Sequence, residues 1–392
     1  MRFCRGIMSR VEKGDIRQLL RMAVLLIFSI AAVSLTHKWD TQASESGDKL
    51  APGSTETELS ALTPASYSWS TNGPAGISVI SLAIHPTDPD TVYAGTAGSG
   101  IYISANGGGS WASVSNEIDT MHVASMAINP QNPQIIYAGT VSGYEATGAY
   151  KTTNGGANWS HIVSGIEDLE ITSLAINPER PDTVFAGVFI NWDSWLGHGV
   201  FRTDDGGVSW RQTVSGMKPV LNLVVKDLAF TIGTPLALFA GTIHEGVGHG
   251  GVFKSTDLGN SWLAKNQGLK SLDISCLAID PNDGDTMYAC TRDSSVFKST
   301  NGGDSWLRPT SLIIQHITSI TMDPSNSQRI FMGTEGQGIY RSEDGGVSWN
   351  TINTGLGNLN ILALDIVHTS STILYAGTGS GVWQCIISET AR

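Results

Sequence analysis

The stretch STNGGDSW (Ser299–Trp306) is one of six copies of a motif that divides this chain into repeats. All copies share the pattern Ser/Thr-x-Asp/Asn-x-Gly-x-x-Trp, and successive tryptophans are 48, 51, 52, 44 and 43 residues apart. A repeat of this length is typical of a propeller blade with four antiparallel strands. The copies begin at Ser104, Thr152, Thr203, Ser255, Ser299 and Ser342.

Three further runs precede the motif in each repeat, and the first repeat shows them as SLAIHP (81–86), VYAGT (92–96) and GIYIS (100–104). Together with the segment led by the motif tryptophan they predict four strands, which we name A to D from the propeller axis outward. The A and B runs are almost continuously apolar. This is expected when both faces of a blade pack against neighbouring blades.

The two ends of the chain complete the repeat pattern. After Trp349 the chain supplies strands A, B and C of a seventh blade (363–367, 374–378 and 381–385) and no strand D. At the other end, SYSWSTNG (66–73) resembles a strand D with no strands A to C before it. The sequence therefore predicts an all-β fold. It is a single seven-bladed β-propeller with four antiparallel strands per blade, spanning residues 66–388 and closed by the N-terminal strand completing blade 7.

The acidic or amide residue of each motif is predicted to hold the turn between strands C and D. Its side chain can accept hydrogen bonds from backbone N–H groups across the turn, and the glycine at the fifth position permits a positive φ. Six copies on six blades favour a structural role, because a catalytic group is needed once. These residues are Asn106, Asn154, Asp205, Asp257, Asn301 and Asp344.

The motifs resemble the bacterial neuraminidase repeat, or Asp-box, superfamily of propellers. This resemblance covers residues 66–388 and implies a fold shared by sialidases, xyloglucan-active endoglucanases, sortilin-like receptors and photosystem II assembly factors. A sialidase needs an arginine triad on the face opposite the Asp-boxes, and the pattern places only Arg292 and Arg308 there. An endoglucanase of this type needs two propellers, whereas this chain supplies one. An assembly factor of the photosystem type is expected to carry a basic patch.

Charge and hydropathy predict export. Residues 22–35 are uncharged and mostly apolar and follow a basic stretch, so 1–35 is predicted to be a signal peptide or an N-terminal membrane anchor. Residues 36–65 are polar and predict a flexible linker. The first 35 residues carry six basic and two acidic groups, and the whole chain carries −12, which leaves −16 on the remainder. We expect a periplasmic or secreted monomer that binds no nucleic acid and no cofactor and meets a membrane only through this anchor.

The B–C loops differ in length and predict a one-sided rim. They are short in blades 1, 5, 6 and 7 and long in blades 2, 3 and 4. Tryptophan faces beside carboxylates suit sugar rings, although these tryptophans could equally pin their own loop. The histidines show no tight metal-ligand spacing, so no metal is predicted. The ligand-binding candidates are Tyr144, Trp192, Trp195, His198, His244 and His249, and the catalytic candidates are Glu145, Asp193 and Glu245.

A second candidate site comes from aligning the A strands. The residue three before each SLAI-type run is expected at the mouth of the central channel, on the same face as the B–C loops. Two histidines and two carboxylates occupy this position in four blades, where they could bind a polar ligand or cation or merely be solvated. These residues are His122, Glu170, Asp273 and His316.

The cysteines leave two alternatives open. Pairing Asp280 with Thr286 across the A–B turn of blade 5 places Cys276 opposite Cys290. Export would permit a disulfide there, and two buried thiols are the alternative. Cys385 would have no partner.

These observations favour a non-catalytic extracytoplasmic binding or assembly module whose B–C loop face binds a glycan or an envelope protein. A glycoside hydrolase acting on a polysaccharide is the first alternative. A photosystem-type assembly factor of a membrane complex is the second.

Overall fold

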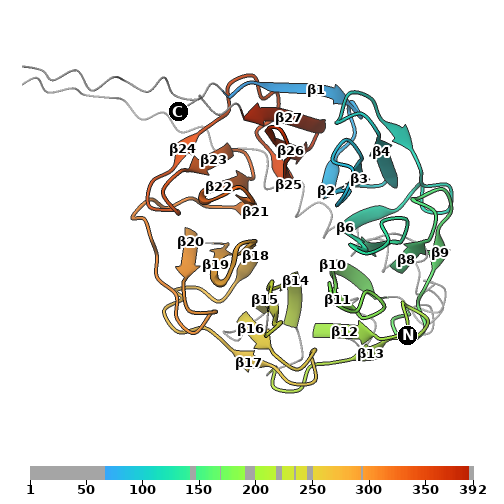
Figure 1. Cartoon of the computed structure of the whole chain (residues 1–392), viewed down its shortest axis with the longest axis horizontal. Coiled ribbons are helices and arrows are strands. Elements are labelled where there is room, and N and C mark those ends of the chain that lie inside the picture. Colours follow the sequence, from blue (N-terminus) through green and yellow to red (C-terminus); the bar gives the residue numbers. More distant parts are fainter. Residues whose placement is uncertain are drawn as a thin grey trace, which may run out of the picture. The chain divides into compact units, whose positions relative to one another are not determined.

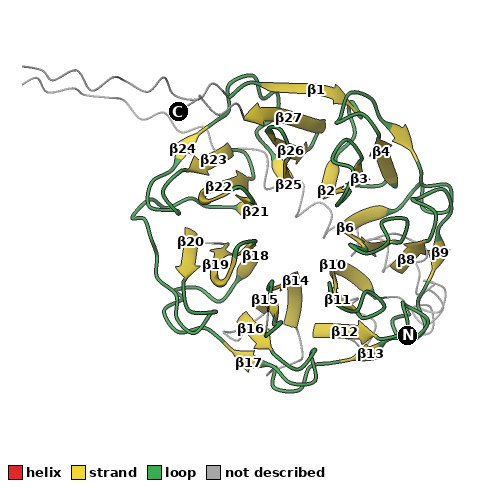
Figure 2. Ribbon diagram, in the orientation of Figure 1, coloured by secondary structure: helices red, strands yellow, loops and turns green. Residues whose placement is uncertain are grey.

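The computed structural model describes residues 67–141, 147–167, 169–189, 199–217, 223–233, 235–244, 250–292 and 295–387. These residues form seven antiparallel sheets around a central axis, as Figure 1 shows. The described residues contain strands and turns and no helix (Figure 2). The all-β prediction and the seven blades are therefore confirmed, while the predicted segments 1–35 and 36–65 lie outside the described residues.

Blades 1 to 4 each consist of four strands in chain order, with strand A nearest the axis. Blade 1 contains β2 (Val79–Ile84), β3 (Val92–Thr96), β4 (Ile101–Ser104) and β5 (Ala112–Ser113), and blade 2 contains β6 (His122–Ile128), β7 (Ile136–Val141), β8 (Gly148–Thr152) and β9 (Ser160–His161). Blade 3 contains β10 (Glu170–Ile176), β11 (Val184–Phe189), β12 (Gly199–Thr203) and β13 (Arg211–Gln212), and blade 4 contains β14 (Leu223–Phe230), β15 (Leu238–His244), β16 (Gly251–Ser255) and β17 (Leu263–Ala264).

The remaining strands complete blades 5 to 7. Blade 5 contains β18 (Ile274–Asp280), β19 (Asp283–Thr291) and β20 (Ser295–Ser299), and blade 6 contains β21 (Ile317–Asp323), β22 (Asn326–Thr334), β23 (Gly338–Ser342) and β24 (Asn350–Thr351). Blade 7 contains β25 (Ile361–His368), β26 (Thr372–Thr378) and β27 (Gly381–Ile387), with β1 (Trp69–Gly73) as its strand D.

Closure of the ring occurs through the N-terminal strand, as predicted. Strand β1 pairs antiparallel with β27, and Trp69 lies opposite Cys385. Blade 7 is thereby built from both ends of the propeller (Figure 1). This pairing leaves strand C of blade 7 without a free hydrogen-bonding edge.

Strand D of blade 5 is reduced to a single bridge between Lys298 and Leu307. In other blades the residue three after the motif tryptophan donates its backbone N–H to strand C; in blade 1, for example, Val114 N donates to the Ile101 oxygen over 2.9 Å. In blade 5 this residue is Pro309, which has no N–H to donate. The outer strand of blade 5 therefore ends one residue earlier than the repeat pattern predicts.

The hydrophobic core is divided among the seven seams between neighbouring blades. Each of seven clusters of buried apolar side chains combines residues of two adjacent sheets. Between blades 1 and 2, for example, Tyr93 packs with Val123 and Trp159, which are all at most 5% exposed. Burial of both faces of each sheet explains why strands A and B are almost continuously apolar.

In blades 2 to 5 the motif tryptophan links its blade to the one before it, whereas the Trp111 N–H of blade 1 has no partner among the described residues. The indole N–H of Trp159 donates to the Val114 oxygen at 2.8 Å, and that of Trp262 donates to the Thr213 oxygen at 3.0 Å. The same link recurs for Trp69, Trp210 and Trp306. Trp349 differs, because it donates to the Gly346 oxygen of its own turn at 2.9 Å.

Strands B and C reach the motif turn of the following blade. Tyr137 Oη and Lys151 Nζ both donate to the Gly206 oxygen, at 3.2 and 2.8 Å. Lys254 Nζ donates to the Gly302 oxygen at 3.0 Å and lies over the Phe239 ring. The motif turns of blades 2 to 6 are therefore bonded joints between two blades as well as turns within one.

Candidate functional site

Hydrogen bonds between loops identify the two faces of the propeller. In blades 1, 2, 3, 5 and 6 the A–B loop contacts the C–D turn of its own blade; in blade 1 the Gly107 N–H donates to the Asp90 oxygen at 2.8 Å. On the opposite face the D–A segment contacts the short B–C loop, since Gly98 and Gly100 both donate to the Met121 oxygen. We call the first face the motif face and the second the B–C face.

The predicted rim lies at three adjacent places on the B–C face. Its loops connect β7 to β8, β11 to β12 and β15 to β16, in blades 2, 3 and 4. His244 is the last residue of β15. The remaining rim candidates lie outside the described residues, and their roles stay predictions: Tyr144, Glu145, Trp192, Asp193, Trp195, His198, Glu245 and His249.

The predicted channel-mouth residues occupy one equivalent position in four blades. His122 and Glu170 are the first residues of β6 and β10, while Asp273 and His316 immediately precede β18 and β21. Strand register aligns them, because the next residue of each strand pairs with the same position of strand B. In blade 4 the equivalent residue is the buried Val224, which interrupts the polar ring.

Electrostatics at the mouth differ from one member to the next. Partial burial lowers the pKa of His122, which favours its neutral form. His316 is exposed and has a positive φ of 56°. Within the part of the chain that the structure describes, no three His, Cys, Asp or Glu side chains are grouped to hold a metal ion. The mouth is therefore a ring of equivalent positions, and its ligand-binding role stays a prediction.

Below the mouth, a β-bulge in every strand A shapes the channel. The ladder to strand B skips one residue in each blade, and the skipped residues all line a central cavity of about 230 Å³. Blades 7, 1 and 2 contribute apolar residues and blades 3 to 6 polar ones. The skipped residues are Ile80, Ala124, Thr172, Lys226, Ser275, Thr318 and Leu362.

Two carboxylates at blade seams were not predicted from the sequence. Asp227 lines the cavity, and its Oδ2 accepts the Leu277 N–H of blade 5 at 2.8 Å. Asp365 Oδ2 accepts the Ile84 N–H of blade 1 at 3.1 Å. Burial raises the pKa of each carboxyl to about 6. A column-by-column alignment of the A strands would have revealed both, because serine or alanine occupies these columns in most blades.

The Asp-box residues share one set of contacts. In every box the first-position hydroxyl accepts the N–H of the fifth-position glycine at 2.8–3.0 Å. The acidic or amide Oδ1 accepts the N–H of the residue before the tryptophan, also at 2.8–3.0 Å. These contacts lie within the turn and support a structural role for Asn106, Asn154, Asp205, Asp257, Asn301 and Asp344.

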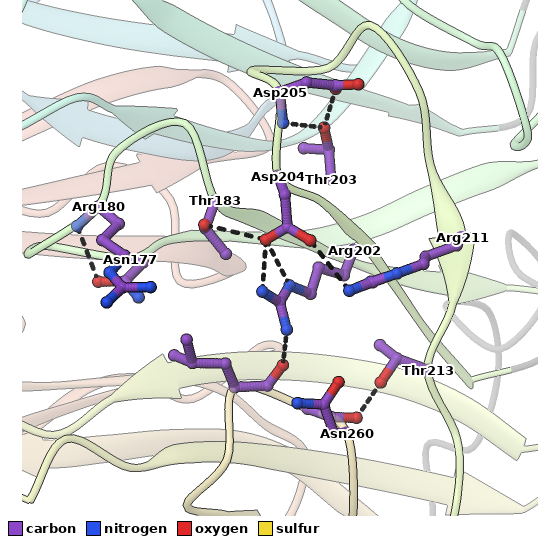
Figure 3. A network of polar contacts seen from close by, with 12 residues as sticks. Asn177, Arg180, Thr183, Arg202, Thr203, Asp204, Asp205, Arg211, Thr213 and Asn260 are labelled. Atoms are coloured by element: carbon purple, nitrogen blue, oxygen red, sulfur yellow. Dashed lines mark hydrogen bonds and ion pairs between the residues drawn. The ribbon is translucent and has the colours of Figure 1, made fainter.

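Two arginines of blade 3 also form structural contacts near the motif turn. Figure 3 shows Asp204 between Arg202 and Arg211, with the Thr183 hydroxyl donating to the same carboxylate at 3.1 Å. Arg202 also donates to the Leu258 oxygen of the next blade at 2.6 Å. These groups lie at the motif face, opposite the B–C loops. They therefore cannot contribute to an arginine triad on the B–C face.

Comparisons with known proteins identify the class of fold. No protein-family model and no curated protein matches the sequence. The structure is similar to the GH74 enzyme of Niastella koreensis, at 20% identity and a TM-score of 0.59 over 78% of this chain and 51% of that one. It is also similar to the GH74 xyloglucanase of Xanthomonas campestris, at 17% identity and a TM-score of 0.62 over 81% of this chain and 53% of that one.

A third similar structure has a length closer to this chain. It is described as YCF48 bound to D1 peptide, and it aligns at 12% identity with a TM-score of 0.58 over 85% of this chain and 98% of that one. This chain thus spans about half the length of the GH74 structures and nearly all of YCF48. At these identities the comparisons establish the seven-bladed propeller fold and fit the Asp-box resemblance.

Proposed function

We propose that this chain is an extracytoplasmic binding module whose B–C face holds a glycan. The observation that carries this proposal is the uneven rim on an otherwise regular scaffold. The three long connections belong to adjacent blades and open on the same face as the channel mouth. Their sequences combine tryptophans with carboxylates, which suits the apolar and hydroxyl faces of sugar rings.

The direction of the closing strand supports the choice of face. Strand β27 runs toward the motif face, and Trp69 pairs with Cys385 near the end of that strand. The chain therefore enters β1 from the motif face and leaves β27 on the same face. Both ends of the described propeller therefore lie at the motif face, which leaves the B–C face clear of them.

Two comparisons bear on the choice between binding and hydrolysis. YCF48, with a chain length like this one, is described as bound to a peptide, and another similar propeller is the extracellular domain of a putative hybrid two component system from B. thetaiotaomicron. The GH74 enzymes extend well beyond the matched propeller. A binding role is accordingly our first proposal. Hydrolysis by a pair among Glu145, Asp193 and Glu245 is the alternative.

The experiment measures retention of the purified chain on a panel of polysaccharides and release of new reducing ends in the same wells. We expect retention without cleavage, and we expect it to be lost when Trp192 and Trp195 are both replaced by alanine. The matched control is Val208→Ala, because Val208 is exposed on the motif face. This control should bind like the unmodified chain.

Two outcomes would contradict the proposal. The first is the release of new reducing ends by the unmodified chain and their loss in a triple variant, which would establish the hydrolase instead. The triple variant combines Glu145→Gln, Asp193→Asn and Glu245→Gln. If the chain is retained on none of the polysaccharides, the glycan-binding role is excluded. The partner to test next would then be an envelope protein, including the subunits of a membrane complex under assembly.

A further inference from the structure

One pair of facing residues departs from the repeat in blade 5 at both positions. Residue 290 of strand B is a cysteine, whereas the equivalent residue of every other blade is glycine: Gly95, Gly139, Gly187, Gly241, Gly333 and Gly377. Its partner in strand A is Cys276, where the other blades have Ser81, Ser125, Ser173, Asp227, Ser319 and Ala363.

The glycine is required because the partner side chain and the next blade lie against it. A Cβ atom on Gly95 would lie 2.2 Å from Ser81 Oγ, and one on Gly333 would lie 2.6 Å from Ser319 Oγ. Both distances are far shorter than any real contact of a Cβ atom. In five of the six blades the nearest atom belongs to the next blade, as at Gly139, where it is Ile171 Cγ2 at 2.6 Å. A side chain at this position of strand B therefore has little room on either side, and in blade 5 the structure holds Cys276 and Cys290 there as two buried thiols.

We propose that Cys276 and Cys290 form a disulfide across strands A and B of blade 5. Directly opposed residues of an antiparallel pair have Cα separations of about 4.5–5.5 Å, within the range that disulfides span. A disulfide brings its sulfur atoms to about 2.05 Å, well inside the contact distance of two thiols. The bond draws the two side chains toward each other in this crowded place, and it accounts for cysteine at both facing positions.

The location of the pair determines when the bond forms. Cys276 is 5% exposed and lines the central cavity, whereas Cys290 is fully buried. Burial raises the pKa of the Cys290 thiol well above its usual range, and the neighbouring Cys276 and Asp227 act in the same direction. Exchange at the folded site is therefore slow. We infer that oxidation takes place during folding, before blade 6 covers Cys290.

The reaction uses an exchangeable disulfide as its oxidant, such as glutathione disulfide. One cysteine thiolate attacks this disulfide to give a mixed disulfide and releases one thiol. The second thiolate then attacks the protein sulfur of the mixed disulfide and releases a second thiol. In total two thiols of the protein are oxidised and one disulfide of the oxidant is reduced to two thiols. In the cell this requires the oxidising compartment assumed under the proposed function.

The test uses the full chain refolded in a glutathione redox buffer, so that it does not depend on export or on the ligand. Free thiols are alkylated in denaturant, the chain is digested without reductant, and peptides are identified by mass. We expect a linked pair of peptides containing Cys276 and Cys290, lighter by about two hydrogens than the separate peptides. Cys385, which is buried in blade 7, should carry the alkyl label. Label on both Cys276 and Cys290 would overturn the proposal.

Variants give an independent readout. Reductant present throughout refolding and melting should lower the thermal midpoint of the unmodified chain by roughly 3–8 °C. The double variant Cys276→Ser, Cys290→Gly restores the residues of blades 1, 2, 3 and 6, and its midpoint should not respond to reductant. The matched control Cys385→Ser should retain the response. If the thermal midpoint of the unmodified chain is the same with and without reductant, the proposal is contradicted.

Discussion

Replacing Asp227 by serine should stabilise the propeller at pH 8 and leave its stability at pH 4 nearly unchanged. Serine occupies the same position in blades 2 and 3. In blade 3 the Ser173 hydroxyl accepts the Leu228 N–H at 2.9 Å, as Asp227 accepts the Leu277 N–H in blade 4. The substitution therefore keeps the bond between blades and removes the buried charge.

The sign follows from the pKa of Asp227, which folding raises from 3.8 to about 6 through burial. Below about pH 4 the carboxyl is protonated in both the folded and the unfolded chain, and its contribution to stability is fully present. As the pH rises through 6, the folded chain must ionise a buried group, and this stability is lost. Two pKa units correspond to about 3 kcal/mol, which is an upper limit because Asp227 lines a cavity and is not fully enclosed by packed side chains.

The assay is urea unfolding at pH 4, 6 and 8, comparing the free energy of unfolding of Asp227→Ser with that of the unmodified chain. We expect a gain of about 1–3 kcal/mol at pH 8 and a change below about 0.5 kcal/mol at pH 4. Asp365 titrates in the same range and remains in both proteins, so its contribution cancels. An equal change at all three pH values, or a loss of stability at pH 8, would refute the reasoning.

Further predictions concern the joints between blades. Trp262→Phe removes a buried indole N–H bond to the preceding blade and should cost about 1–2 kcal/mol by urea unfolding, whereas Trp111→Phe should cost less, because the Trp111 N–H has no partner in the described structure. Lys254→Met loses a bond to the next blade and its position over Phe239, so its thermal midpoint should fall, and an unchanged midpoint would argue against the joint. Hydrogen bonds within its box lower the pKa of Asp205 to about 2, so Asp205→Asn should remove a loss of stability that the unmodified chain shows as the pH falls from about 4 to 2.

The repeats were sufficient to predict the fold, because each blade is specified by its own copy of the same four runs. The number of blades, the closing strand and the pairing of Cys276 with Cys290 all follow from aligning the repeats. Local departures were harder to foresee. Asp280 pairs with Asp283, and the expected pairing with Thr286 is wrong. The reason is local, since Asp280 Oδ1 accepts the Asn282 N–H at 2.8 Å and tightens the turn.

The candidate site was less predictable for a physical reason. The mouth residues could be placed because they belong to strand A, whose position the repeat determines. The carboxylates Asp227 and Asp365 also belong to strand A. They were not recognised because their neighbours in the strand are mostly apolar, and the whole run was interpreted as core. The rim loops have no counterpart in the other blades. Their conformation depends on contacts that no repeat comparison can supply, so Trp192 remains a candidate from its chemistry alone.

The positions at which one blade differs from the others indicate what distinguishes this protein from a regular propeller. The Asp-box positions are the same in six blades and have the same contacts, which is what structure requires. Many of the departures lie in blades 2 to 5. Among them are the three long B–C loops, the charged bulge residue Lys226 with its neighbour Asp227, the facing cysteines and Pro309. Asp365 of blade 7 also departs from its repeat position. Most seams between blades share the same joints, whereas the loops and the channel wall differ from blade to blade. Function is therefore expected where the blades differ, and substitutions that restore the repeat there should preserve folding while removing whatever the difference provides.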